Sequence, residues 1–237
     1  MANKQRLSKR KRLELERRRR QQRRNVGFVA TVVALVVLVI VAIAASRPGS
    51  KPSSRPTATP TPSPVNFSIL PGLQSGPAPW STDLPTLTPR LQALGLPPLP
   101  SEGTVLHIHQ HLDIFVNGHR VTVPASIGIS TLGGGVFFSP LHTHDTSGIV
   151  HVESATVREF TLGEFFGVWG VKLSSNCIGG YCNKGGSTLR AFVDGRPVAG
   201  DPADIPLLSH EEIVLAYGTK NRLPNPIPKS YKFPAGE

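Results

Sequence analysis

The chain is poor in sulfur. Its 237 residues include two cysteines, Cys177 and Cys182, and a single methionine, Met1. Because Cu(I) sites depend on thioether and thiolate sulfur, this scarcity argues against a Cu(I) thioether site. A lone Cys-x4-Cys pair also lacks the second pair of a sulfur-rich zinc site, so metal binding is the weaker alternative for it. A disulfide between Cys177 and Cys182 is the expected state in an oxidising compartment.

Familiar catalytic motifs are also missing. Neither the HExxH motif of helical zinc proteases nor the GxSxG motif of serine hydrolases occurs. Ser139, His142 and Asp145 are the residue types of a catalytic triad, but their close spacing matches no recognised triad. A zinc hydrolase needs three ligands, an open position and a general base, for which Glu153 is only one candidate. A metal-dependent hydrolase is therefore an alternative and not the first prediction.

The net positive charge is nearly confined to the N-terminus. The formal net charge is +11, and residues 1–25 hold 12 Lys/Arg and two Glu, a net of +10. The remaining residues carry only +1, so the high isoelectric point describes a tail. Since no basic patch occurs elsewhere, no nucleic-acid partner is predicted. Residues 1–25 are expected to be a cytoplasmic tail that contacts anionic lipid.

A long apolar run follows the tail. Residues 26–45 contain no charge, and Thr31 is the one polar side chain among them. A helix of this length spans about 30 Å, the hydrocarbon thickness of a bilayer. The basic residues before it predict a single transmembrane helix with a cytoplasmic N-terminus and everything after residue 46 outside. The alternative is a cleaved signal peptide ending near Ala42–Ala45, but signal h-regions usually run about 7–15 residues.

Two proline-rich segments come next. Residues 46–64 have no apolar side chain larger than alanine and are predicted to be a disordered linker. Residues 65–104 are a Pro-rich arm with apolar anchors. Within it, helical spacing followed by a glycine predicts one short amphipathic helix that packs onto the domain from outside. The residues concerned are Leu84, Leu87, Leu91, Leu94 and Gly95.

Residues 105–237 have mostly β patterns. Asn117-Gly118 and Asp194-Gly195 each stand between alternating runs and predict β-hairpins. Only residues 162–169 have a helical pattern, with Thr161 as a possible cap. The predicted fold class is mainly β with one or two short helices (α+β), an extracytoplasmic β-sheet domain preceded by one transmembrane helix.

The two hairpins resemble copies of one unit. Residues 112–121 align with 189–198, and residues 140–145 align with 206–211. The pattern predicts a domain built from two repeated hairpin units. His144 then has a counterpart in His210. By contrast, no histidine in the second copy aligns with five clustered histidines of the first, His107, His109, His111, His142 and His151.

Histidines give the clearest functional signal. In an extended chain, alternate side chains share a face, so His107, His109 and His111 face one side with Asp113, opposite Ile108 and its apolar neighbours. Imidazole is a common ligand of Zn²⁺ and Cu²⁺. The predicted metal ligands are His107, His109, His111, His142, His144 and His151, and the predicted supporting carboxylates are Asp113, Asp145 and Glu153.

A structural role without a metal is the alternative interpretation of the histidines. The histidines would then be a solvated polar face or satisfied core residues, and the domain would be a non-metal module for cell-envelope interactions. Five clustered histidines without counterparts favour metal binding.

Three motifs also carry a resemblance. The segments 107–118, with HxHxHL followed by FVNG, 141–145, with LHTHD, and 160–170 resemble a group of uncharacterised, membrane-anchored bacterial proteins, common in actinobacteria. The resemblance covers roughly residues 80–237 and implies a bacterial cell-surface location without an activity. The predicted function is that of a single-pass, membrane-anchored extracytoplasmic protein that binds copper or zinc, with an unknown protein partner.

Overall fold

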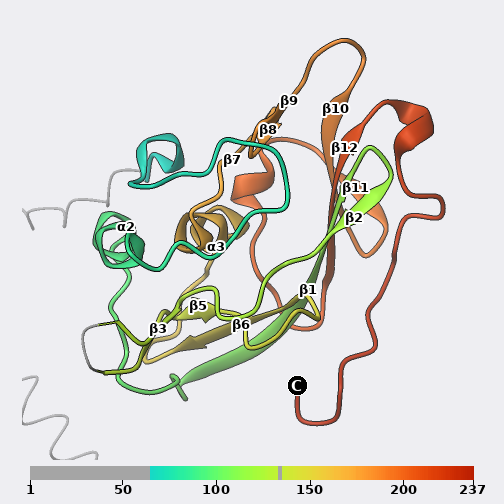
Figure 1. Ribbon diagram of the computed structural model, residues 1–237. Helices are drawn as coiled ribbons and strands as arrows, with labels where there is room; N and C mark the ends of the chain where they lie inside the picture. The colour runs from blue at the N-terminus through green and yellow to red at the C-terminus, as the bar shows by residue number, and fades with distance from the viewer. Residues whose placement is uncertain (1–64, 133–134) are drawn as a thin grey trace, which may run out of the picture. The chain divides into compact units, whose positions relative to one another are not determined.

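The β-patterned segments assemble into one seven-stranded sheet, shown in the computed structural model in Figure 1. The structure describes residues 65–132 and 135–237. The sheet strands are β1 (Leu106–Val116), β2 (His119–Val121), β5 (Leu141–His142), β6 (Ile149–Ser154), β10 (Thr188–Val193), β11 (Arg196–Val198) and β12 (Glu212–Gly218). They follow the order β11-β10-β12-β1-β6-β5, and β2 also pairs with β1. β1 and β12 run parallel, whereas the other pairs are antiparallel.

Short elements complete the described part of the chain. β3 (Ile129–Ser130) pairs with β4 (Phe137–Phe138), and β7 (Leu173–Ser174), β8 (Cys177–Ile178) and β9 (Tyr181–Cys182) form a small sheet. The helices are α2 (Leu87–Leu94) and α3 (Leu162–Trp169), with 3-10 turns η1 (Phe67–Ile69), η2 (Pro202–Asp204) and η3 (Lys220–Arg222). The prediction of a mainly β domain with one or two short helices is confirmed, and both helices are present.

Both helices end at the residues that the sequence predicts, and the predicted cap residue marks the start of α3. The Thr161 side chain accepts a hydrogen bond from the Glu164 backbone N–H, and the Glu164 carboxylate accepts one from the Thr161 N–H. This capping box fixes the start of α3. Gly170 and Gly95 follow the two helices with φ of 78° and 66°, a left-handed conformation that glycine adopts without strain.

The main core lies between one face of the sheet and the two helices. Leu112, Ile114, Val150 and Val152 of the sheet pack in the same buried cluster as the apolar face of α3. The arm joins this cluster and does not simply cover it from outside. Its buried members are Leu70, Trp80, Leu87, Leu91, Leu94 and Leu96.

The opposite face of the sheet is partly covered by residues 223–237, which run to the end marked C in Figure 1. Leu223 and Ile227 pack against a small apolar cluster that contains Phe192 and Val214. Further along the segment, Tyr231 stacks on the His111 ring with 3.8 Å between ring centroids. This face therefore passes from an apolar end to a histidine-rich end.

Both predicted hairpins are present. Asn117 and Gly118 have φ of 52° and 86°, and Asp194 and Gly195 have 51° and 75°. Positive φ at both central residues is typical of type I′ turns, which suit the twist of paired strands.

The duplication itself is not confirmed. In the first unit, Ile149 of β6 lies opposite His111 of β1. In the second, the aligned residue Ile213 of β12 lies opposite Val193 of β10, whose counterpart by alignment is Val116. The downstream strands thus pair in different registers, and the repeated unit stays a prediction.

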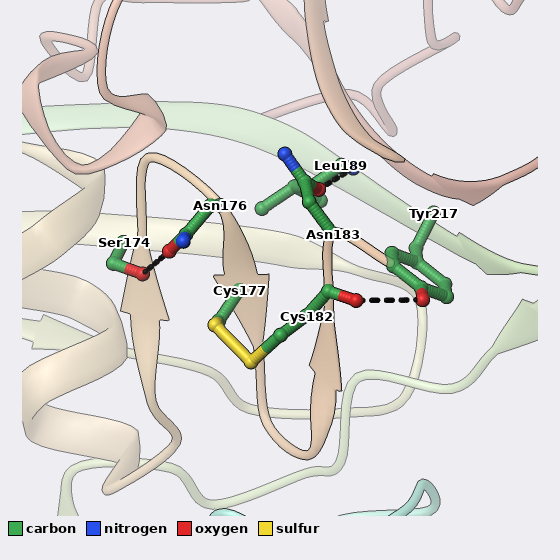
Figure 2. Close-up of a disulfide and its surroundings, with 7 residues drawn as sticks. All are labelled: Ser174, Asn176, Cys177, Cys182, Asn183, Leu189 and Tyr217. Atoms are coloured by element: carbon green, nitrogen blue, oxygen red, sulfur yellow. Dashed lines mark hydrogen bonds between the residues drawn. A yellow bond between two sulfur atoms is a disulfide. The ribbon is translucent and has the colours of Figure 1, made fainter. Parts of the chain in front are cut away.

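The disulfide between Cys177 and Cys182 is present, as predicted. The two residues lie opposite each other on β8 and β9, with 4.1 Å between their Cα atoms. Figure 2 shows how this small sheet is tied to its surroundings: the Tyr217 hydroxyl donates to the Cys182 carbonyl oxygen at 2.8 Å. In the same view, the Leu189 backbone N–H donates to Asn183 Oδ1 at 2.6 Å.

Three predicted segments lie outside the described residues: the basic tail (1–25), the transmembrane helix (26–45) and the linker (46–64). Across 65–132 and 135–237, no helix has the length and apolar character needed to cross a bilayer.

Candidate metal centre

Strand pairing brings three imidazoles into one row across the sheet. His109 of β1 lies opposite His151 of β6, and His151 lies opposite His142 of β5. Directly opposite side chains on one face are neighbours, about 4.5–5.5 Å apart at Cβ. Two residues further along the strands, on the same face, His107 lies opposite Glu153. The predicted convergence of the two histidine-rich segments is therefore present.

Ring nitrogens point at one another in pairs. The Nε2 atoms of His107 and His109 are 3.1 Å apart, and those of His142 and His144 are 3.2 Å apart. Two ligands of one tetrahedral Zn²⁺, each about 2.0–2.1 Å from the ion, lie about 3.3 Å from each other. Each pair thus has the separation of two metal ligands.

A backbone hydrogen bond selects the tautomer of His142 that leaves Nε2 free to bind a metal. Its Nδ1 lies 3.0 Å from the Ser139 carbonyl oxygen, which can only accept a hydrogen bond. The proton of a neutral ring is therefore on Nδ1, and Nε2 presents a lone pair to the cluster. Burial lowers the pKa of His142 to about 4, so the ring is neutral at physiological pH. Burial also lowers the pKa of His109, and the neighbouring His151 adds to this effect.

Glu153 lies at the centre of the histidines. Its Oε1 is 3.2 Å from His151 Nδ1, 3.4 Å from His107 Nε2 and 3.8 Å from His142 Nε2. Burial alone would raise the pKa of Glu153, but the hydrogen bond from His151 and the surrounding imidazoles outweigh it and lower that pKa. The carboxylate is thus charged at neutral pH. Its contacts exceed the roughly 2.7–2.9 Å of a charge-assisted hydrogen bond.

Together these residues, which we call the histidine cluster, form two overlapping ligand sets. One contains His107, His109, His151 and Glu153, and the other contains His142, His144, His151 and Glu153. Within each set, one ligand atom per residue lies within 4.8 Å of every other. The cluster therefore includes five of the six predicted ligands and one predicted carboxylate.

Two further carboxylates reach the cluster from outside the predicted set. Glu102 Oε1 is 3.3 Å from His144 Nε2. Glu237 Oε2 is 3.5 Å from His109 Nε2 and 3.8 Å from His151 Nε2, and it is buried without a hydrogen-bond partner. Glu102 lies 42 residues before the His144 that it contacts, and Glu237 lies 128 residues after His109, so no local pattern ties either glutamate to its partner.

His210 lies at the edge of the cluster. Its backbone N–H donates to the His109 carbonyl oxygen at 2.6 Å, and its Nε2 lies 3.0 Å from the Glu237 carbonyl oxygen. With a φ of 62°, it occupies a left-handed turn position, unlike His144. The two residues that the alignment pairs, His144 and His210, thus differ in backbone conformation.

His111, the sixth predicted ligand, lies outside the cluster in a third set of side chains close enough to hold an ion, with Asp113 and Glu212. Its Nδ1 is 2.7 Å from Glu212 Oε2, and its Nε2 is 3.0 Å from the Ser147 carbonyl oxygen. Because that carbonyl oxygen can only accept, Nε2 is the donor to it, and Nδ1 faces the Glu212 carboxylate. Burial raises the pKa of Glu212, and the hydrogen bond with His111 opposes this effect. Both ring nitrogens of His111 therefore have protein partners, and the residue links three separate segments of the domain.

The other two predicted carboxylates also lie outside the cluster. Asp113 belongs to the His111 group and forms an ion pair with Arg120 of β2. Asp145 accepts a hydrogen bond from the Ser147 backbone N–H at 2.8 Å and closes a turn. Neither belongs to the two ligand sets, so Glu153 alone of the three predicted carboxylates lies among the histidines.

Comparisons with known proteins do not assign the chain to a family. No family model matches the chain, and no curated protein or solved structure matches it either. The resemblance to membrane-anchored actinobacterial proteins is therefore still a prediction.

Proposed function

We propose that this protein binds a divalent transition metal, Zn²⁺ or Cu²⁺, at the histidine cluster. The observation that carries the proposal is the convergence of four Nε2 atoms as two pairs 3.1 and 3.2 Å apart. Each facing nitrogen pair offers one hydrogen bond at most, whereas a cation between the two nitrogens can take a lone pair from both. Glu153 supplies the negative charge.

The donor set limits the choice of metal. Nitrogen and carboxylate oxygen suit Zn²⁺ and Cu²⁺, whereas Cu(I) prefers sulfur. The two cysteines are bonded to each other and do not belong to the ligand sets. Ligand geometry alone does not separate Zn²⁺ from Cu²⁺, so both belong in the first titration.

The proposal includes a location. Residues 26–45 would anchor the chain in a membrane, with residues 1–25 in the cytoplasm against anionic lipid and the β domain outside. A disulfide between Cys177 and Cys182 supports this orientation, because disulfides persist in oxidising compartments. A reporter fused after Glu237 should be active outside the cytoplasm, and activity inside would overturn this orientation.

Metal binding is tested on the full chain, purified in detergent without a histidine tag and stripped with chelator. Isothermal titration with Zn²⁺ and Cu²⁺ should give saturable binding that the chelator reverses. The His119→Ala variant is a matched control, since His119 is exposed on β2 and belongs to no ligand set. Absence of saturable binding of either ion would refute the proposal and favour a non-metal envelope module.

A further inference from the structure

The histidine cluster offers more ligands than one ion uses. It contains five imidazoles and Glu153, whereas Zn²⁺ usually takes four ligands. Ligand atoms of one ion lie at most about 4.2 Å apart, twice the length of a metal–ligand bond. Each set has one pair of histidines that the other set lacks: His107 with His109, and His142 with His144. The two pairs come from opposite sides of β6. A single ion would leave one pair without a role.

From this arrangement we infer that the cluster is a dinuclear centre, in which two divalent ions share Glu153. One ion is held by His107 and His109, and the other by His142 and His144. His151 stands between the pairs. This inference rests on the proposed metal binding and adds the number of ions and the bridging group.

Glu153 has the position and the free oxygen that a bridge requires. Oε1 lies between the pairs, 3.4 Å from His107 Nε2 and 3.8 Å from His142 Nε2. Oε2 is buried without a hydrogen-bond partner, and the residue as a whole is 1% exposed. A buried carboxylate oxygen normally has a partner. Two oxygens with about four lone-pair sites allow one carboxylate to contact two cations.

The outer carboxylates repeat the division into two halves. Glu237 lies against His109 on one side, at 3.5 Å, and Glu102 lies against His144 on the other, at 3.3 Å. Each imidazole pair thus has a carboxylate of its own in addition to the shared Glu153. Three carboxylates against two divalent ions leave a residual charge of about +1, which a bound hydroxide or another anion can neutralise.

Counting bound ions in single variants tests the inference. His107 and His144 are the exposed members of their pairs, with side chains 48% and 41% exposed, so replacing them should leave the fold intact. The full chain, dialysed against Zn²⁺ and analysed by mass spectrometry, should retain two ions. His107→Ala and His144→Ala should each retain one, and His119→Ala should retain two.

The outcomes separate the inference from the proposed function. No retained Zn²⁺ in the unaltered chain overturns both. One ion per chain supports metal binding and overturns the dinuclear centre. Two ions that persist in both variants place the ions elsewhere and also overturn it.

Loading with Cu²⁺ tests whether the two ions are neighbours. Ions that share a carboxylate lie about 3.5–4 Å apart in dinuclear sites. Their spins should couple, so the integrated electron paramagnetic resonance signal should fall well below the copper content. In His144→Ala, the signal should match the single copper that remains. A full signal at two coppers per chain would contradict the shared carboxylate.

Discussion

On β1, His109 and His111 are two residues apart and face the same side of the sheet, yet their nitrogens meet different partners. His111 lies between Glu212 and the Ser147 carbonyl oxygen, at 2.7 and 3.0 Å. His109 meets the Nε2 atom of His107 at 3.1 Å and Glu237 at 3.5 Å. The first ring is fully hydrogen-bonded by groups that complement it, whereas the second faces another imidazole and a distant carboxylate.

The difference separates structural histidines from candidate ligands. Buried polar groups normally find hydrogen-bond partners, and a group without a good one needs a specific explanation. In the His111 group, both ring nitrogens face oxygen atoms, although Glu212 Oε1 is buried without a partner. In the histidine cluster, the imidazoles face each other in pairs, and Glu153 Oε2 and Glu237 Oε2 lack partners. A cation would satisfy these atoms and the facing imidazoles at once.

The largest expected effect is on the cluster itself. Replacing His109 and His142 together by alanine removes one buried ligand from each half. The dissociation constant should rise at least about 1000-fold, or about 4 kcal/mol. Titration calorimetry measures it, and circular dichroism of the metal-free variant checks the fold. Unchanged metal affinity in a folded variant would show that the clustered histidines have a structural role, as His111 does.

His111→Ala should have the opposite signature. It leaves Glu212, which is 1% exposed, without its partner, so the free energy of unfolding should fall by about 3 kcal/mol. Metal affinity should stay within about threefold, because the cluster keeps its ligands. Urea unfolding of the metal-free protein measures the first quantity, with His119→Ala as control. A loss of metal without a loss of stability would place His111 among the ligands.

The stability of the metal-free protein should depend on pH because His142 is buried. Burial keeps His142 neutral in the folded state down to about pH 4, whereas the unfolded chain takes up that proton near pH 6.5. Between these values the unfolded state binds more protons. The free energy of unfolding should therefore fall as the pH is lowered through this window, by on the order of 3 kcal/mol.

Urea unfolding at a series of pH values in chelator measures this slope. His142→Asn should flatten it, because asparagine does not titrate. A slope that is the same in this variant would show that other groups control acid stability.

The smallest expected effect concerns the C-terminal segment. Glu237→Gln keeps the size of the side chain but removes its charge beside His109 and His151. Since neighbouring carboxylates tune metal affinity by about 10–100-fold, the dissociation constant should rise by about tenfold. Glu159→Gln is the matched control, because Glu159 is exposed and belongs to no ligand set. An equal change in both variants would indicate a general charge effect.

Local patterns in the sequence predict much of the fold. The alternation of β1 correctly assigns its histidine face, and the two Asx-Gly pairs correctly mark hairpin turns. The extent of α3 follows from its capping residues, because a cap acts within one helical turn. These features depend on neighbours in the chain, which is why the sequence alone is enough to find them.

The division of the histidines depends on distant segments. His111 is removed from the cluster by Glu212, which lies opposite it on a parallel strand 101 residues away. Glu237 and Glu102 reach the cluster through the packing of whole segments. Alternation places side chains on a face but does not say which strand pairs alongside. The sheet order β12-β1-β6 decides which imidazoles are structural and which converge.

X-ray absorption at the zinc edge tests the central claim most directly. The full chain, loaded with Zn²⁺ and dialysed, should show nitrogen and oxygen ligands at about 2.0–2.1 Å, with the outer scattering pattern of imidazole. The His109→Ala, His142→Ala double variant should lose this pattern. Bound zinc without imidazole scattering in the unaltered chain, or no retained zinc, would contradict a metal centre built from the histidine cluster.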